Sequence, residues 1–171
     1  MTKSIFISVS FLFCTITFGQ NSVDEKDSYF PLTKGISKTL TWYNNKYREV
    51  VEDTITFEGK VYTRVAQIFP PDETINMYYF KSNDTIYYFN EVKRKHTPFF
   101  SINPVEGETT ANGTVKKVGA TLKTPKGKLT NLLVIEMVYV SGQKDTRYYK
   151  KGLGLVAVKN NGRLVCYYVP D

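Results

Sequence analysis

The sequence predicts a single antiparallel β domain, a curved sheet or half-barrel of roughly 8–11 strands with little helix. In residues 21–171, Val, Ile, Thr, Tyr, Phe and Trp total 60, whereas Ala and Leu total 13. β-Branched and aromatic side chains favour strands, so an all-helical protein is excluded. The length suits one domain rather than a multidomain enzyme. A hydrophobic content of 42% with 23% charged residues excludes wholesale disorder.

Residues 1–20 have the pattern of a secretory signal peptide. Lys3 precedes an apolar stretch from Ile5 to Ile16, and small residues follow near a plausible cleavage point. The stretch is shorter than the about 20 apolar residues that span a membrane. Phe11, Leu12 and Phe13 are too large to precede a lipidated cysteine at Cys14. We therefore expect an exported protein (periplasmic, outer-membrane-associated or secreted) that does not span the membrane after cleavage.

Cleavage would leave Cys166 as the single cysteine and a net charge of +6, from 22 Lys and Arg against 16 Asp and Glu. A lone cysteine forms no intramolecular disulfide, and its strand-like context predicts a buried thiol. Export removes nucleic acid as a partner. The lysines are spread along the chain, which favours solvated strand faces and protected sheet edges. The alternative is attraction to anionic lipid headgroups or surface glycans.

Residues 21–28 are polar and predict a flexible lead, with the folded part beginning at Tyr29. Turn signals divide the remaining chain into strands. Asn161–Gly162 is the strongest of them, because a type I′ turn needs positive φ at both central positions. Pro70–Pro71 ends another strand, since prolines donate no ladder hydrogen bond. The predicted strands are 38–43, 47–57, 60–69, 75–80, 85–89, 115–122, 130–140, 146–149, 153–159 and 163–169.

Two segments lead to further structural predictions. Residues 93–113 contain prolines and glycines and one short apolar island, which predicts a long loop that could act as a lid or hold a short helix. Residues 130–140 are apolar on both faces, which predicts a central strand covered on both sides. Glu136 interrupts that strand and should either form an ion pair, with a partner such as Arg64 or Arg147, or face a polar cavity.

Catalytic motifs are missing from the sequence. His96 is the single histidine, and no orienting acid is adjacent. No pattern suits a metal ion or a cofactor. The acids that come close along the chain fit exposed faces as well as a cleft, so a hydrolase built on Glu49, Glu52 or Glu136 is a less favoured alternative. The sequence therefore predicts no catalytic residue, no metal, no cofactor and no enzyme activity.

The positive signal is the thirteen tyrosines, several of them in doublets. Adjacent strand residues point to opposite faces, so each doublet supplies one inward and one outward ring. The rings could simply form a core, or they could line a concave face that holds an apolar or amphiphilic envelope ligand. An alternative is a module that docks onto an envelope protein or glycan. The candidate ligand-binding residues are Trp42, Tyr79, Tyr88, Phe99, Phe100, Tyr139 and Tyr149.

Three motifs carry a family resemblance: Tyr29-Phe30-Pro31-Leu32 with Gly35, Thr124-Pro125-Lys126-Gly127 before a hydrophobic strand, and Tyr148–Val156 with glycines at 152 and 154. Together they resemble the TapB-like family of exported bacterial domains of unknown function, akin to lipoprotein-carrier-like curved sheets. The Phe-Gly-Gln that ends the signal resembles those of exported Bacteroidota proteins. The resemblance implies a strongly curved antiparallel sheet without established catalytic residues. The glycines are expected to serve turns and close backbone approaches.

Overall fold

The structure, a computed structural model, describes residues 25–170, which form one antiparallel sheet of twelve strands. The predicted signal peptide and residues 21–24 lie outside the described residues. A single 3-10 turn, η1, precedes the sheet. The elements are η1 (Glu25–Asp27), β1 (Ser37–Trp42), β2 (Asn45–Phe57), β3 (Lys60–Phe69), β4 (Glu73–Ser82), β5 (Thr85–Asn90), β6 (Lys95–Ser101), β7 (Thr109–Thr110), β8 (Gly113–Thr124), β9 (Gly127–Val138), β10 (Lys144–Lys150), β11 (Gly154–Asn160) and β12 (Arg163–Val169).

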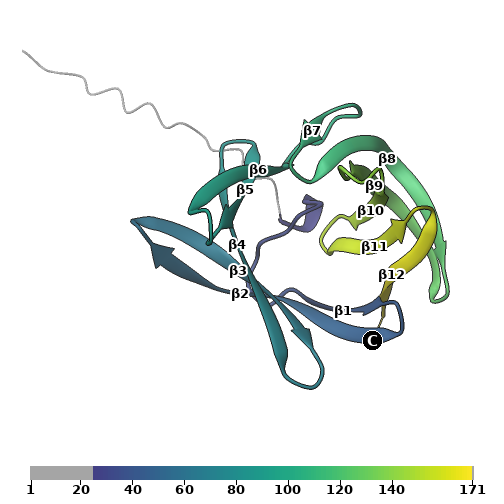
Figure 1. The fold of residues 1–171 in the computed structure, drawn as a ribbon, viewed down its shortest axis with the longest axis horizontal. Coiled ribbons are helices and arrows are strands. Elements are labelled where there is room, and N and C mark those ends of the chain that lie inside the picture. The colour runs from purple at the N-terminus through teal and green to yellow at the C-terminus, as the bar shows by residue number, and fades with distance from the viewer. Residues whose placement is uncertain (1–24, 171) are drawn as a thin grey trace, which may run out of the picture.

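The sheet curls until it is nearly closed into a barrel (Figure 1). Its order is β6-β5-β4-β3-β2-β1-β12-β11-β10-β9-β8-β7, so neighbours are consecutive in the chain except β1 and β12. The pairing of β1 with β12 joins the two ends of the meander. At the remaining seam, Ala111 N donates to Pro98 O over 3.0 Å and Thr110 Oγ1 donates to Phe99 O over 2.8 Å. These two bonds hold the edge strands together.

The predicted curved antiparallel sheet is confirmed, and it has more strands than the roughly 8–11 that the turn signals suggested. The additional strands come from residues 93–113. The prediction of a lid or a short helix in this segment is wrong, because β6 and β7 form there instead. Pro98 lies inside β6, which is an edge strand of the sheet. An edge strand tolerates a residue without an N–H, so a proline that reads as a strand breaker is accommodated at the seam.

Two predicted hairpins form as expected. Asn161 and Gly162 have φ of 45° and 83°, as the predicted type I′ turn between β11 and β12 requires. β4 and β5 pair around Asn83, which brings Tyr79 opposite Tyr88 with ring centroids 5.7 Å apart. The two tyrosine doublets therefore meet across this hairpin.

Strand β9 separates two apolar clusters, as predicted for a strand covered on both faces. Leu133 belongs to the cluster inside the barrel, and its neighbour Leu132 belongs to an outer cluster; both are fully buried. Residues near the β8–β9 turn, such as Leu122, pack in the outer cluster. Glu136 forms an ion pair, but with Lys116 at 3.2 Å rather than with Arg64 or Arg147. Lys116 lies two residues beyond the residue of β8 that pairs with Glu136. Its side chain therefore reaches the carboxylate across the two strands.

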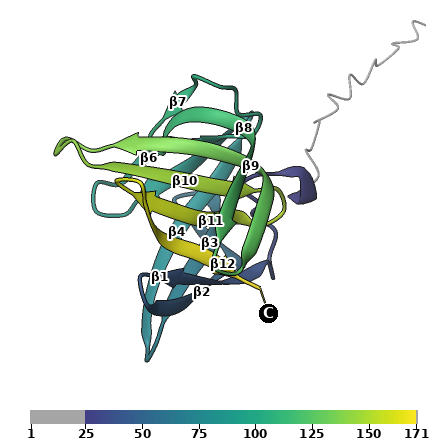
Figure 2. The same cartoon turned by 90° about the vertical axis from the view of Figure 1, so that its right-hand side faces the viewer.

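The folded part begins before Tyr29. Residues Glu25–Asp27 form η1, and Ser28 is buried with its carbonyl accepting a hydrogen bond from Gly152 N at 2.8 Å. A Cβ at Gly152 would lie 3.2 Å from the carbonyl oxygen of Lys26, which explains the predicted close approach of the backbone at this glycine. Figure 2 shows η1 and the end of β12 on the same side of the barrel. Within residues 25–170, no helix is long and apolar enough to cross a membrane.

Candidate ligand-binding cavity

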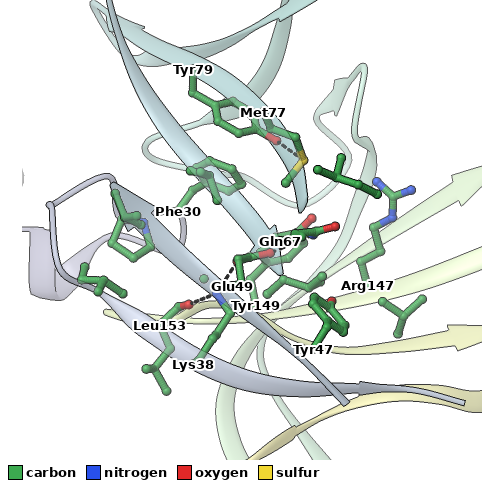
Figure 3. Close-up of a pocket in the computed structure, with 18 of the residues that line it drawn as sticks. Phe30, Lys38, Tyr47, Glu49, Gln67, Met77, Tyr79, Arg147, Tyr149 and Leu153 are labelled. Carbon is green, nitrogen blue, oxygen red and sulfur yellow. Dashed lines mark hydrogen bonds and ion pairs between the residues drawn. The ribbon is translucent and has the colours of Figure 1, made fainter. Parts of the chain in front are cut away.

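The barrel holds a cavity of about 490 Å³. Its lining residues towards the end that carries η1, such as Tyr79 and Tyr149, are buried, whereas Trp42 and Ile75 at the other end are exposed. Its walls come from β1, β2, β3, β4, β6, β10 and β11 and from the segment before β1 (Figure 3). Most of the lining is aromatic or aliphatic. The apolar lining side chains include Ile36, Val51, Val65, Phe69, Met77, Leu155 and Val158.

The segment before β1 closes the cavity at the end that carries η1. The ring of Phe30 lies 5.0 Å from that of Tyr79 and 5.6 Å from that of Phe99 between centroids. Beside it, a Cβ at Gly154 would lie 3.3 Å from Lys38 Nζ and 3.6 Å from Pro31 Cδ. Glycine at 154 therefore lets the β10–β11 turn approach the segment closely. Phe30 therefore packs among aromatic rings at this end of the barrel and lines the cavity there.

A row of polar side chains crosses the cavity wall next to this closed end. Lys38 Nζ donates to Glu49 Oε1 and to the carbonyl of Leu153, each at 2.6 Å, and Gln67 Nε2 donates to the second carboxylate oxygen of Glu49 at 3.0 Å. Lys38 and Glu49 are register partners on β1 and β2, as are Glu49 and Gln67 on β2 and β3. The side chains of Lys38 and Glu49 are only 5% and 14% exposed, so the row is a buried ion pair with its amide support.

A second polar group surrounds Arg147, which lines the opposite wall from β10. Its guanidinium donates to the Oδ1 of the fully buried Asn112 and to the hydroxyl of Tyr139. Asn112 in turn donates to the hydroxyl of Tyr149 at 2.8 Å. Burial opposes the charge of Arg147, but Tyr149, Tyr139 and Asp145 raise its pKa overall. The guanidinium therefore stays charged and is held in place on the cavity wall.

Two lining tyrosines remain neutral hydroxyl groups. Burial raises the pKa of Tyr79 well above its ordinary value, and it also raises the pKa of Tyr149. The Tyr79 hydroxyl donates to Met77 Sδ at 3.5 Å, while that of Tyr149 accepts from Asn112. Both rings thus present apolar faces with an uncharged polar atom to the cavity.

Four side chains mark the open end of the cavity. Trp42 and Ile75 are exposed at 41% and 44%, and Phe69 ends β3 and Glu73 begins β4 at the same end. The cavity therefore changes along its length, from the aromatic Phe30 at the closed end through the polar row to a partly apolar mouth.

The structure brings four of the seven predicted ligand-binding residues to the cavity: Trp42, Tyr79, Phe99 and Tyr149. The other three do not line it. Tyr88 packs behind Tyr79 and Phe99, and Phe100 is buried against Phe30 and Tyr149. Tyr139 is not part of the lining, although its hydroxyl donates to Asp145, which is, at 2.6 Å.

Local backbone geometry explains the placement of the two phenylalanines of β6. Ile86 pairs with Phe100 and Tyr87 pairs with Pro98, so Phe99 is the extra residue of a β-bulge. A bulge re-aims a side chain. Neighbouring Phe99 and Phe100 consequently both contact Phe30 in the interior, against strict alternation.

The polar side chains are the part of the site that the sequence prediction missed. Lys38, Gln67 and Arg147 were not predicted to line a cavity, and Glu49 was considered only as a hydrolase acid. One sequence signal points to Lys38, because it alternates with Leu40 and Trp42 and so shares their face of β1. Register with β2 and β3 is needed to place Glu49 and Gln67 beside it.

The three candidate hydrolase acids do not converge. Glu49 pairs with Lys38 in the cavity, Glu52 pairs with Arg64 at 2.6 Å, and Glu136 pairs with Lys116. No group of three or more His, Cys, Asp or Glu side chains within residues 25–170 could hold a metal ion.

The contacts and burial of His96 and Cys166 indicate that both residues serve the fold. The Tyr62 hydroxyl and His96 Nε2 lie 2.7 Å apart in a hydrogen bond, and burial with the charge of Lys60 lowers the pKa of His96. Cys166 is completely buried, which raises the pKa of its thiol to about 12. The predicted buried cysteine is confirmed.

Comparisons with known proteins identify the fold. An exported-protein candidate with a YmcC-like fold from Bacteroides fragilis superposes with a TM-score of 0.50 at 12% identity, over 84% of this chain and 97% of that one. A candidate lipoprotein from Parabacteroides distasonis gives a TM-score of 0.49 at 12% identity, over 84% and 96%. The likeness to the first protein is one of fold alone. No protein-family model and no curated protein sequence matches the chain, so the TapB-like resemblance is not confirmed.

Proposed function

We propose that the protein is an exported, non-enzymatic binding domain that holds an amphiphilic molecule of the cell envelope inside its barrel. The observation that carries the proposal is the cavity of about 490 Å³, with apolar walls and a row of polar atoms part-way along it. Small-molecule sites are typically clefts of about 300–1,000 Å³ with this combination of lining groups. The pattern of residues 1–20 supports export.

The charges in the wall indicate the kind of polar group that the ligand carries. Lys38 is already paired with Glu49, and Arg147 lies 3.8 Å from Asp145 as well as bonding Asn112. A ligand with a large net charge would have to displace one of these partners and leave it buried without compensation. The proposed ligand therefore has an apolar body and an uncharged or zwitterionic polar group.

Native mass spectrometry of the protein, purified gently from a bacterial host that exports it, tests the proposal. We expect an added mass on the order of several hundred daltons, matched to the cavity size, that organic extraction releases. Replacing Met77, which lines the cavity, by Trp fills part of it and should reduce the adduct. The matched control is Tyr78→Trp, because the adjacent side chain points to the other face of β4 and lines a separate outer pocket.

Two results would contradict the proposal. One is a bare mass that persists after incubation with an envelope lipid extract. The other is an adduct held equally by the Met77→Trp and Tyr78→Trp variants while both melt as cooperatively as the unsubstituted protein. The thermal melts are needed because overpacking a core typically costs about 1–3 kcal/mol.

A further inference from the structure

Three turns lie side by side at the open end of the barrel. Tyr43 N in the β1–β2 turn donates to Val165 O at the start of β12, and Lys144 N donates to Asn161 Oδ1, which links the β9–β10 and β11–β12 turns. Figure 2 shows the β9–β10 and β1–β2 turns at the end of the molecule away from η1. We call residues 42–48, 138–144 and 159–163 the rim.

The rim exposes an unusual number of large apolar side chains. Val140 is fully exposed, and Tyr43 and Val138 are each more than half exposed. Trp42 and Tyr43 lie edge to face with centroids 6.1 Å apart. These side chains project from separate turns, and aromatic residues with a polar atom are the ones that favour the water–membrane interface.

The rim also carries almost the whole net charge of the mature chain. It has five cations and no acid among the three segments, whereas the rest of residues 21–171 has seventeen cations and sixteen acids. Asp145 borders the rim but is buried, with its carboxylate bonded to Tyr139 and Asn160. The exposed acids at this end, Asp72 and Glu73, lie at the β3–β4 turn outside the three rim segments. The rim cations are Lys46, Arg48, Lys144, Lys159 and Arg163.

None of these five cations takes part in an ion pair within the described part of the chain. Lys159 Nζ lies over the ring of Tyr148 at 5.8 Å from its centroid, and Lys46, Lys144 and Arg163 are exposed. The rim thus offers uncompensated positive charge around exposed apolar tips. Its complement is a surface with negative charges outside and apolar material just beneath.

We propose that the rim docks the domain onto the surface of an anionic phospholipid bilayer. Trp42, Tyr43 and Val140 enter the headgroup region, while the cations face lipid phosphates. Each cation near such a surface strengthens binding by about fivefold, and apolar tips add to this by burial. The charge around the tips favours phospholipid over a neutral glycan.

Binding to vesicles tests this proposal directly. We expect the purified protein to sediment with mixed phosphatidylglycerol–phosphatidylcholine vesicles and far less with phosphatidylcholine alone, and to be released as salt screens the charges. Trp42 is the sole tryptophan, so its emission should shift to the blue and be quenched by brominated lipid. Equal binding to both vesicle types, or no binding to either, would overturn the proposal.

Paired variants separate the rim from the rest of the surface. Lys144→Glu should lower vesicle affinity by roughly 25-fold, because it removes one attraction and adds one repulsion. Lys126→Glu, in the exposed turn at the other end of β9, should have little effect. Val140→Asp should weaken binding, whereas Val61→Asp, at an exposed site on β3 away from the mouth, should not. Equal losses within either pair would overturn the proposal.

The docking proposal goes beyond the binding function proposed above and can fail separately from it. Met77→Trp fills the cavity without touching the rim, so this variant should lose its adduct and still bind anionic vesicles. If Met77→Trp loses vesicle binding while it remains folded, the bilayer contact depends on the cavity rather than on the rim, and the docking proposal is wrong.

Discussion

The buried ion pair between Lys38 and Glu49 leads to a quantitative prediction about stability. Lys38→Met keeps the length and much of the volume of the side chain but removes the ammonium group. Glu49, 14% exposed, is then left with the amide of Gln67 as its remaining bonded partner. Removing one member of a buried pair typically costs about 3–5 kcal/mol. Because Glu49 faces a cavity that opens to solvent, we expect about 3 kcal/mol of unfolding free energy to be lost.

The double variant Lys38→Met/Glu49→Leu distinguishes a lost ion pair from lost packing. It removes both charges, so no buried charge remains uncompensated. What it leaves is the carbonyl of Leu153 and the amide of Gln67 without their partners, at about 1 kcal/mol each. The double variant should therefore cost about 2 kcal/mol, less than the sum of the two single variants by at least ~2 kcal/mol.

Urea unfolding followed by far-UV circular dichroism measures these costs. Lys34→Met is the matched control, since the ion pair of Lys34 with Asp53 is 68% exposed on both sides and should contribute less than about 1 kcal/mol. The reasoning is refuted if Lys38→Met and Lys34→Met cost the same. It is also refuted if the costs of Lys38→Met and Glu49→Leu simply add in the double variant.

Three other features give predictions of their own. The lowered pKa of His96 means that the unfolded chain binds a proton first as the pH falls below about 6.5, so stability should decrease towards pH 5. In urea unfolding, the stability of the His96→Gln variant should fall less towards pH 5; an unchanged pH profile would show that His96 does not cause the decrease. Cys166, with a pKa of about 12, should react with a thiol reagent only in denaturant, and rapid labelling of native protein would contradict its burial. Phe30→Ala should lower the unfolding free energy by about 3–4 kcal/mol, whereas Tyr43→Ala at an exposed rim position should change it little; equal effects would count against Phe30 as the closure of the barrel.

The parts of the fold that could be predicted from the sequence are those set by local patterns. Asn161–Gly162 fixes a hairpin because few residues accept its backbone angles, and the near-continuous apolar run in 130–140 locates a strand buried on both faces. The seam could not be predicted. β7 has only two residues, and Pro98 disguises β6, so pairing across the seam rather than local preference makes these segments strands.

The candidate site divides in the same way. Aromatic residues such as Trp42 and Tyr149 stand out because the sequence is rich in tyrosine and several aromatic residues occur in adjacent pairs. The polar row does not, because Lys38, Glu49 and Gln67 come from three strands. Each alternates with apolar residues, but charged and amide side chains are mostly exposed in proteins, so alternation alone does not mark them as buried. The strand register places these three side chains opposite one another, and only this register shows that Lys38 belongs to a buried ion pair.

The cavity and the rim share one end of the barrel, and this arrangement connects the two proposals. Trp42 lines the cavity mouth and also belongs to the rim, while Phe30 closes the far end beside η1. A domain docked through the rim would therefore turn its mouth towards the bilayer and its closed end towards the aqueous side. An amphiphile could then pass between bilayer and cavity without crossing water, with its polar group reaching the Lys38–Glu49 row. This arrangement requires that the rim cations act without the cavity, because docking must precede entry of the ligand; the cavity-filled protein should accordingly bind vesicles as strongly as the unsubstituted one.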